Sequence, residues 1–275
     1  MTAVLSYVEK KSVVHRLTGT TKLFFFLLWS IGAMITYDTR VLVFMFLSGC
    51  FFFKVSKLKW REIRFALLFM FTLIGINLLG IYIFAPEQGV KIYGTRTVVT
   101  ELFFHYSITW EQLFYLFNFM MKYMAVIPVA LLFIMATNPS EFAASLNRVG
   151  VSYKISYAVA IALRYIPDIQ RDYREISQSC QARGVELGKD AKVIDRIKNS
   201  ATILFPLVLS SIERIETISN AMELRGFGKH KKRTWIMIRS MEKRDYYVIF
   251  LGICFLVLSV VMIFYNRGRY YNPFQ

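Results

Sequence analysis

Three long apolar runs limit what this chain can fold into more than any other feature of its sequence. They cover residues 65–85, 113–136 and 247–265. A helix that crosses a bilayer needs about 20 consecutive apolar residues, and each run comes close to or exceeds that length. Hydrophobic residues make up 56% of the chain, more than a soluble domain usually carries. The sequence therefore predicts an all-α, polytopic membrane protein in a lipid bilayer.

Two shorter apolar runs precede these three. Residues 23–37 and 41–53 flank the polar turn Asp38-Thr39-Arg40. We interpret them as a helical hairpin whose flanking residues complete two further crossings, which gives about five transmembrane helices. A buried hairpin that does not fully cross is the alternative. No small-residue cleavage site follows the first run, so we expect no cleavable signal peptide.

The distribution of lysine and arginine predicts the orientation. More than half of these residues lie between residues 137 and 246, whereas the loop 86–110 has only Lys91 and Arg96. Cytoplasmic loops of membrane proteins carry the excess of positive charge. We therefore predict a cytoplasmic N-terminus and a C-terminus on the other side, although Arg267 and Arg269 lie against that rule. The net charge of +16 fits an anionic membrane face or an acidic protein. No nucleic-acid recognition signature is present, so we expect no nucleic acid partner.

The stretch 137–246 is too polar for further spans, but its apolar residues recur at helical spacing from 155 to 180 and from 194 to 222. Such stripes are typical of amphipathic helices. Pro167 and Pro206 fall inside them and should kink or break them. A shorter helix is predicted over 139–148, ended by Gly150. The sequence thus predicts transmembrane helices 1–4 in residues 1–136, a cytoplasmic helical domain in 137–246, and the last span with its tail in 247–275.

The two long amphipathic helices have the same ending. One finishes in Ala182-Arg183-Gly184 and the other in Leu224-Arg225-Gly226, 42 residues later (225 − 183), and an Ile-Ser pair precedes each arginine at the same interval. Glycine at a helix end supplies the left-handed residue, and arginine suits the negative end of the helix dipole. A guanidinium projecting past the helix tip could bind a carboxylate of another protein in bidentate fashion. The alternative is a helix stop that is simply used twice.

Several stretches together resemble one known family, the T component (EcfT/CbiQ-like) of energy-coupling factor, or ECF, type ABC transporters. The T component is the transmembrane coupling subunit of these bacterial vitamin and metal importers. The second arginine motif differs from the family in having Leu224 where alanine is common. Besides the two Arg-Gly endings, the stretches that carry the resemblance are His15-Arg16-Leu17, Thr20-Thr21-Lys22-Leu23, Thr137-Asn138-Pro139-Ser140-Glu141, Leu146-Asn147-Arg148-Val149-Gly150 and Ala162-Leu163-Arg164-Tyr165-Ile166-Pro167.

The resemblance implies a role and partners. In that family the two arginine motifs dock onto two ATP-binding cassette ATPase subunits, one each, in a multi-pass protein of the bacterial cell membrane. The rest of the cytoplasmic domain contacts a small substrate-binding membrane subunit, the S component. By this resemblance the ATPase-docking residues are Ala182, Arg183, Gly184, Leu224, Arg225 and Gly226. The chain itself is expected to bind neither ATP nor the transported vitamin or metal ion.

Catalytic and cofactor motifs are missing from the sequence. The run from Gly184 to Asp190 is the nearest to a phosphate-binding loop, but it is one residue too short between its glycines. Asp190 also stands where that loop has serine or threonine. The cysteines and histidines are too scattered for a metal site or a disulfide framework: Cys50, Cys180, Cys254, His15, His105 and His230. We therefore predict that the chain is not an enzyme and holds no cofactor and no metal.

A few polar residues fall inside or beside the apolar runs. Lys122 lies within the fourth run, where an ionisable group suggests function, but it could instead snorkel or pair with a neighbouring subunit. Hydrogen bonds between helices explain Asn77 and Asn118 adequately. Glu111 lies at the interfacial edge of its run.

Two other functions compete with the coupling subunit. A secondary transporter permease acting without ATPases would need a midplane site on broken helices, often with repeated halves, and the only clear repeat lies outside the spans. A membrane-bound enzyme would need acid and base residues clustered near the interface, and none cluster convincingly.

Overall fold

The computed structural model describes residues 12–274 except 57, 59, 102–106, 185–192, 231–233 and 236–238. The chain divides into two compact units. Unit 1 consists of Met1–Glu141 and Ile238–Gln275, and unit 2 of Phe142–Met237.

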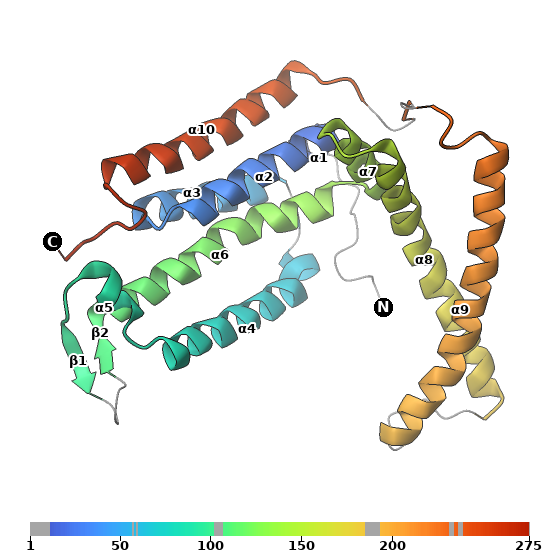
Figure 1. The fold of residues 1–275 in the computed structure, drawn as a ribbon, viewed down its shortest axis with the longest axis horizontal. Helices are drawn as coiled ribbons and strands as arrows, with labels where there is room; N and C mark the ends of the chain where they lie inside the picture. Colours follow the sequence, from blue (N-terminus) through green and yellow to red (C-terminus); the bar gives the residue numbers. More distant parts are fainter. Residues whose placement is uncertain are drawn as a thin grey trace. The chain divides into compact units, whose positions relative to one another are not determined.

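Unit 1 is a layered bundle of long helices (Figure 1). Helix α2 packs against α10 and α6, α3 packs mainly against α6, and α4 lies along the other side of α6. The elements of unit 1 are α1 (Val13–Arg16), α2 (Gly19–Ile35), α3 (Thr39–Val55), α4 (Trp60–Phe84), α5 (Gln88–Tyr93), β1 (Val98–Glu101), β2 (Ser107–Thr109), α6 (Trp110–Ala136) and α10 (Lys243–Tyr265).

Three of the described helices are long and apolar enough to cross a membrane: Ile63–Phe84, Trp110–Ala136 and Lys243–Tyr265. They confirm the predicted all-α polytopic membrane protein. Helix α2 is a shorter apolar helix of 17 residues, and α3 has the same length. Seventeen helical residues rise about 26 Å, somewhat less than the roughly 30 Å hydrocarbon core. Five crossings, which include α2 and α3, therefore remain a prediction.

Trp29 of α2 is the centre of the unit 1 core. Its side chain is fully buried, its ring lies 4.4 Å from that of Phe255 in α10, and its indole N–H donates to the Ala125 carbonyl of α6 at 2.9 Å. Leu42 and Met45 of α3 complete the same core. Burying apolar area and pairing the indole donor together hold α2 between α10 and α6.

Helix α4 contacts the bundle through one narrow face. Ile63, Ala66 and Ile74 are buried, whereas most of its large apolar side chains are exposed, as with Leu68 at 66% and Phe69 at 58%. In water such a surface would be unstable, so it fits a lipid environment or a membrane partner.

The loop 86–110 contains structure that the sequence did not predict. It folds into α5 and a two-stranded antiparallel hairpin in which Val98 faces Thr109 and Glu101 faces Ser107. The hairpin is the only sheet among the described residues. His105 lies outside the described residues.

Unit 2 holds most of α7 (Pro139–Arg148), together with α8 (Tyr153–Ala182) and α9 (Val193–Leu224). Helices α8 and α9 cross while running in opposite chain directions (Figure 1). Helix α7 has the predicted bounds, and Gly150 after it has a φ of +110°, so the predicted glycine stop is confirmed.

The sequence predicted that proline would kink or break the two amphipathic helices, and the structure contradicts the break. Pro167 lies inside the 30-residue α8 and Pro206 inside the 32-residue α9, and both helices continue through them. A proline removes one backbone hydrogen bond. The many hydrogen bonds on either side, and the packing of α8 on α9, are enough to keep each helix continuous.

Candidate functional site

Both Arg-Gly pairs stand where the sequence predicts, at helix C-termini. Gly184 has a φ of +82° and Gly226 a φ of +66°. After α9 the Gly226 N–H donates to the Glu223 carbonyl at 2.8 Å and the Phe227 N–H to the Met222 carbonyl at 2.9 Å. These two bonds form a Schellman motif, which satisfies carbonyls that the helix end leaves free.

Arg183 and Arg225 are exposed, and so are Ala182, Gly184 and Leu224, whereas Gly226 is half-buried. Leu224 is 89% exposed. Arg225 shares a hollow with Tyr157 and Arg164 near the start of α8, and the Phe227 ring lies 4.9 Å from that of Tyr157. The second ending is thus placed near the beginning of the opposite helix. The six predicted docking residues accordingly form two separate patches, one at each helix end.

An ion pair joins α8 and α9. The Arg214 guanidinium donates to the Asp172 carboxylate at 2.6 Å. These residues are 42 positions apart, the same offset as between Arg183 and Arg225. Each partner of the ion pair therefore lies 11 residues before its own arginine, or about 16 Å along the helix. An apolar groove of about 430 Å³ beside the pair is lined by Ile161, Ala162, Tyr165, Ile215 and Ile218, among others.

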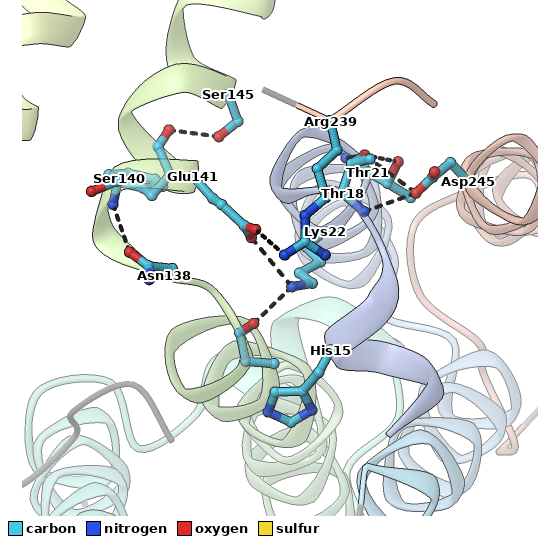
Figure 2. A network of polar contacts seen from close by, with 12 residues as sticks. His15, Thr18, Thr21, Lys22, Asn138, Ser140, Glu141, Ser145, Arg239 and Asp245 are labelled. Carbon is cyan, nitrogen blue, oxygen red and sulfur yellow. Dashed lines mark hydrogen bonds and ion pairs between the residues drawn. The ribbon is translucent and has the colours of Figure 1, made fainter. Parts of the chain in front are cut away.

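A polar cluster in unit 1 surrounds the first turn of α2 (Figure 2). We call it the Lys22–Glu141 cluster; it consists of Thr18, Lys22, Ala136, Glu141, Arg239 and Asp245. The Lys22 ammonium donates to the Ala136 carbonyl at 2.7 Å and lies 3.8 Å from the Glu141 carboxylate, whose other oxygen lies 3.6 Å from Arg239. The Ala136 carbonyl belongs to the last residue of α6, where the helix dipole favours a cation.

The same cluster ties the start of α10 to α2. The Asp245 carboxylate accepts hydrogen bonds from the Thr18 N–H at 3.0 Å and from the Thr18 hydroxyl at 3.2 Å (Figure 2). Its second oxygen accepts from the Glu242 N–H at 2.9 Å. Thr18 is the N-cap of α2, so one carboxylate stabilises the beginning of two helices.

At the opposite end of α2 lies a second cluster, which contains Lys122. Its ammonium donates to the Met34 carbonyl at 2.7 Å and lies 3.3 Å above the centre of the Tyr37 ring. Lys122 is thus buried and satisfied within its own chain, and it does not snorkel. Asn118 accepts from the Thr39 hydroxyl at 2.6 Å, as expected for a bond between helices. Asn77 departs from that expectation, because it donates to the Leu73 carbonyl of its own helix.

The C-terminal tail covers this second cluster. The Tyr37 N–H donates to the Arg269 carbonyl at 2.8 Å, and the Tyr270 ring stacks on Tyr37 at 4.6 Å. Burial raises the pKa of Tyr270 to about 12, so its hydroxyl stays neutral. Asn266 donates to Asp38 at 2.6 Å. Burial opposes ionisation of Asp38, but hydrogen bonds from Arg40 and Asn266 outweigh it and lower the pKa of this carboxyl.

Residues 10–236 match the protein family CbiQ, described as cobalt transport protein. The chain belongs to this family. It is also similar to curated proteins named energy-coupling factor transporter transmembrane protein EcfT. The relative from Staphylococcus aureus is 23% identical, with 87% of this chain and 88% of the relative covered. The relative from Streptococcus equi subsp. equi is 26% identical over 89% and 90%, and that from Lactococcus lactis subsp. cremoris 22% identical over 95% and 96%.

Membership confirms the predicted EcfT/CbiQ-like family, and together with the three apolar helices it makes the chain a membrane protein. Sequence reasoning singled out Lys122 in this CbiQ-family chain but missed its partner. It included Lys22 and Glu141 only as parts of motifs that resemble the family. Their contact joins residues 119 positions apart, so no local pattern could have revealed it. Of the run from Gly184 to Asp190, only Gly184 is among the described residues.

Proposed function

We propose that this chain is the transmembrane coupling subunit of an ECF-type ABC importer. It would pass the ATP-driven motion of two ATPase subunits to a substrate-binding S component for vitamin or metal-ion uptake. Membership of the CbiQ family and similarity to ECF transmembrane proteins support this role. The proposal also includes the multi-pass arrangement in a bacterial cell membrane, with residues 137–246 as the cytoplasmic domain and the N-terminus on the cytoplasmic side.

One observation carries the ATPase-docking role of Arg183 and Arg225. Both arginines lie the same distance along their helices from the Asp172–Arg214 ion pair, at exposed helix ends. If each ATPase holds one arginine, the helix segments from the ion pair to Arg183 and to Arg225 would move as two levers of equal length. Closing the ATPases would then change the crossing of α8 and α9 by a shear-type movement.

The bonding inside unit 1 favours coupling over a permease acting without ATPases. Lys122 and Asn118, polar residues of α6 inside the bundle, are already bonded to the chain itself. The cavity of about 280 Å³ between α3, α4 and α6 is lined by apolar side chains such as Phe46, Phe71 and Leu131. An ion or polar solute gains no ligands from such a lining.

The test is purification of the complex from cells that also make the ATPase pair and the S component. The double variant Arg183→Ala with Arg225→Ala should lose at least ten-fold of the copurified ATPase while the S component stays bound. Arg171→Ala, an exposed arginine in the middle of α8, is the matched control and should keep the wild-type amount. Full ATPase association in the double variant would remove the docking role.

Uptake identifies the substrate class. Proteoliposomes with the whole complex should accumulate either ⁵⁷Co²⁺ or one of a panel of tritiated water-soluble vitamins. Accumulation should require ATP on the side of the membrane that carries the ATPases. Accumulation by the purified chain alone, driven by an ion gradient, would instead support the permease.

A further inference from the structure

The chain passes between its two compact units twice, and both passages are fastened to the first turn of α2. It leaves unit 1 after Glu141 and returns at Ile238. We propose that Lys22 is a positioning residue for energy coupling. Lys22 holds Glu141, where the chain leaves unit 1, against α2. A displacement of unit 2 then moves α2 and α10, and is not taken up by bending of the chain at the two connections between the units. This inference rests on the proposed function.

The connection from α6 to α7, through which the chain leaves unit 1, is short and constrained. Only Thr137 and Asn138 separate the end of α6 from the start of α7. The Asn138 side chain accepts from the Ser140 N–H at 3.0 Å and so fixes the first turn of α7 (Figure 2). A Cβ added to Gly19 of α2 would lie 2.9 Å from the Glu141 carbonyl oxygen, so the backbones at these two residues of unit 1 are in direct contact.

Lys22 supplies the stronger of the two charged contacts to Glu141. The side chains of Lys22 and Glu141 are 2% and 14% exposed, so water and salt screen their attraction weakly. The Arg239 side chain is 64% exposed, and pairs of that kind contribute little. Without Lys22, Glu141 would keep only the weaker contact, and the Ala136 carbonyl would lose its donor.

The returning passage is fastened to the same turn by a different bond. Asp245 binds Thr18, three residues before Thr21 and four before Lys22, and Arg239 binds Glu141 from the returning side. A force on either passage therefore reaches α2. Because α2 packs closely on α10, the two helices would move as one body.

Hydrogen exchange on the purified complex tests this transmission, with ATP and vanadate as the probe. The complex, with its ATPases bound, is measured in lipid nanodiscs without nucleotide and with ATP plus vanadate. In the wild type, nucleotide should change exchange in α8 and α9 and also in the first turns of α2 and α10. In Lys22→Met the response of α8 and α9 should remain, whereas that of α2 and α10 should fall at least three-fold.

The matched control is Arg16→Met, which removes an exposed cation beside the cluster and should keep the wild-type response. A wild-type response of α2 in Lys22→Met would overturn the proposal. So would a wild-type complex whose α2 does not respond to nucleotide at all.

A second variant separates transmission from stability. Replacing a buried ion pair by apolar residues of similar size is often neutral or stabilising. Lys22→Met with Glu141→Met should therefore fold even if Lys22→Met alone does not. A folded double variant that binds ATPases but shows no response in α2 supports the ionic link, and one with the full response overturns it.

Failure of this inference is distinguishable from failure of the proposed function. If the wild-type chain binds no ATPase, the proposed function is wrong and this inference falls with it. If ATPases bind and α8 and α9 respond, but Lys22→Met leaves the response of α2 unchanged, only the role of Lys22 is wrong.

Discussion

Gly89 in α5 stands where the backbones of two helices meet. A Cβ at this position would lie 2.4 Å from the Glu111 carbonyl oxygen and 2.6 Å from the Gln112 backbone. The Gly89 N–H also donates to the Gln112 side chain at 2.7 Å. Gly89→Ala must therefore push α5 away from α6, and overpacking of this kind costs about 1–3 kcal/mol. We expect a melting temperature several degrees lower in detergent, measured by thermal unfolding.

Gly80→Ala is the control for this glycine. Gly80 lies in α4, and nothing lies within 4 Å of its added Cβ. Alanine is favoured over glycine in a helix by roughly 0.5–1 kcal/mol, so this variant should be as stable as the wild type or more stable. Equal melting temperatures for the two variants would contradict the close contact at Gly89.

The contact between Asp38 and Asn266, which helps to hold the C-terminal tail, should depend on pH. Its pKa in the folded chain is below the ordinary value, so its ionised form stabilises the fold above the unfolded pKa of about 3.9. That stabilisation is lost as the pH falls through the folded pKa. Asp38→Asn should lose about 1.5–3 kcal/mol at pH 7, as for a hydrogen bond to a charged group. Thermal unfolding of both proteins at pH 7 and at pH 3 should show their difference shrinking in acid.

The residues of the candidate site differ in how far sequence could place them. Gly184 and Gly226 were predicted correctly, because a left-handed helix stop is a local property. Lys122 was recognisable as unusual in its span, but its acceptor is the Met34 carbonyl, 88 positions away. Backbone acceptors carry no sequence signature. The docking role of Arg183 and Arg225 stays a prediction.

At the scale of elements, α2 and α6 each have a buried lysine that donates to a backbone carbonyl near the C-terminus of the other helix. Lys22 of α2 donates to the Ala136 carbonyl at the C-terminus of α6, and Lys122 of α6 donates to the Met34 carbonyl in the last turn of α2. Each ammonium satisfies a carbonyl that the helix end leaves without a partner, at the negative end of its dipole. The apolar runs predicted both helices, whereas this pairing depends on their antiparallel packing and was not visible in either run.

The prolines inside the long helices should reduce stability. Pro167 has no N–H for the Leu163 carbonyl, and proline is about 3 kcal/mol less favourable than alanine inside a helix. Pro167→Ala should therefore raise the melting temperature. Pro139→Ala is the control, because proline is well tolerated at the first position of α7. It should leave the melting temperature unchanged or lower it, and a rise in this variant alone would contradict the explanation.

At the scale of the whole molecule, periodicity predicted the helices better than their arrangement. Apolar length was enough for α4, α6 and α10, because a span must satisfy its own backbone in lipid. The hairpin of β1 and β2 was missed, since strands of four and three residues leave almost no alternation to read. The packing of the tail on Tyr37 was missed too, because it depends on long-range aromatic contacts.

Unit 1 carries a different polar cluster at each of its two ends. The Lys22–Glu141 cluster lies at the beginning of α2 and α10 and at the end of α6, whereas Tyr37, Tyr93 and Tyr270 meet at their other ends. If these helices span the bilayer, the two clusters face opposite sides. The C-terminal tail then belongs with the hairpin loop despite Arg267 and Arg269, and the positive-inside rule puts the lysine-rich end in the cytoplasm. In a cysteine-free background, Asn272→Cys should react with a membrane-impermeant maleimide in intact cells, whereas Arg239→Cys should react only after permeabilisation. Labelling of both cysteines in intact cells would show that α10 does not separate the two sides, and the reverse pattern would invert the orientation.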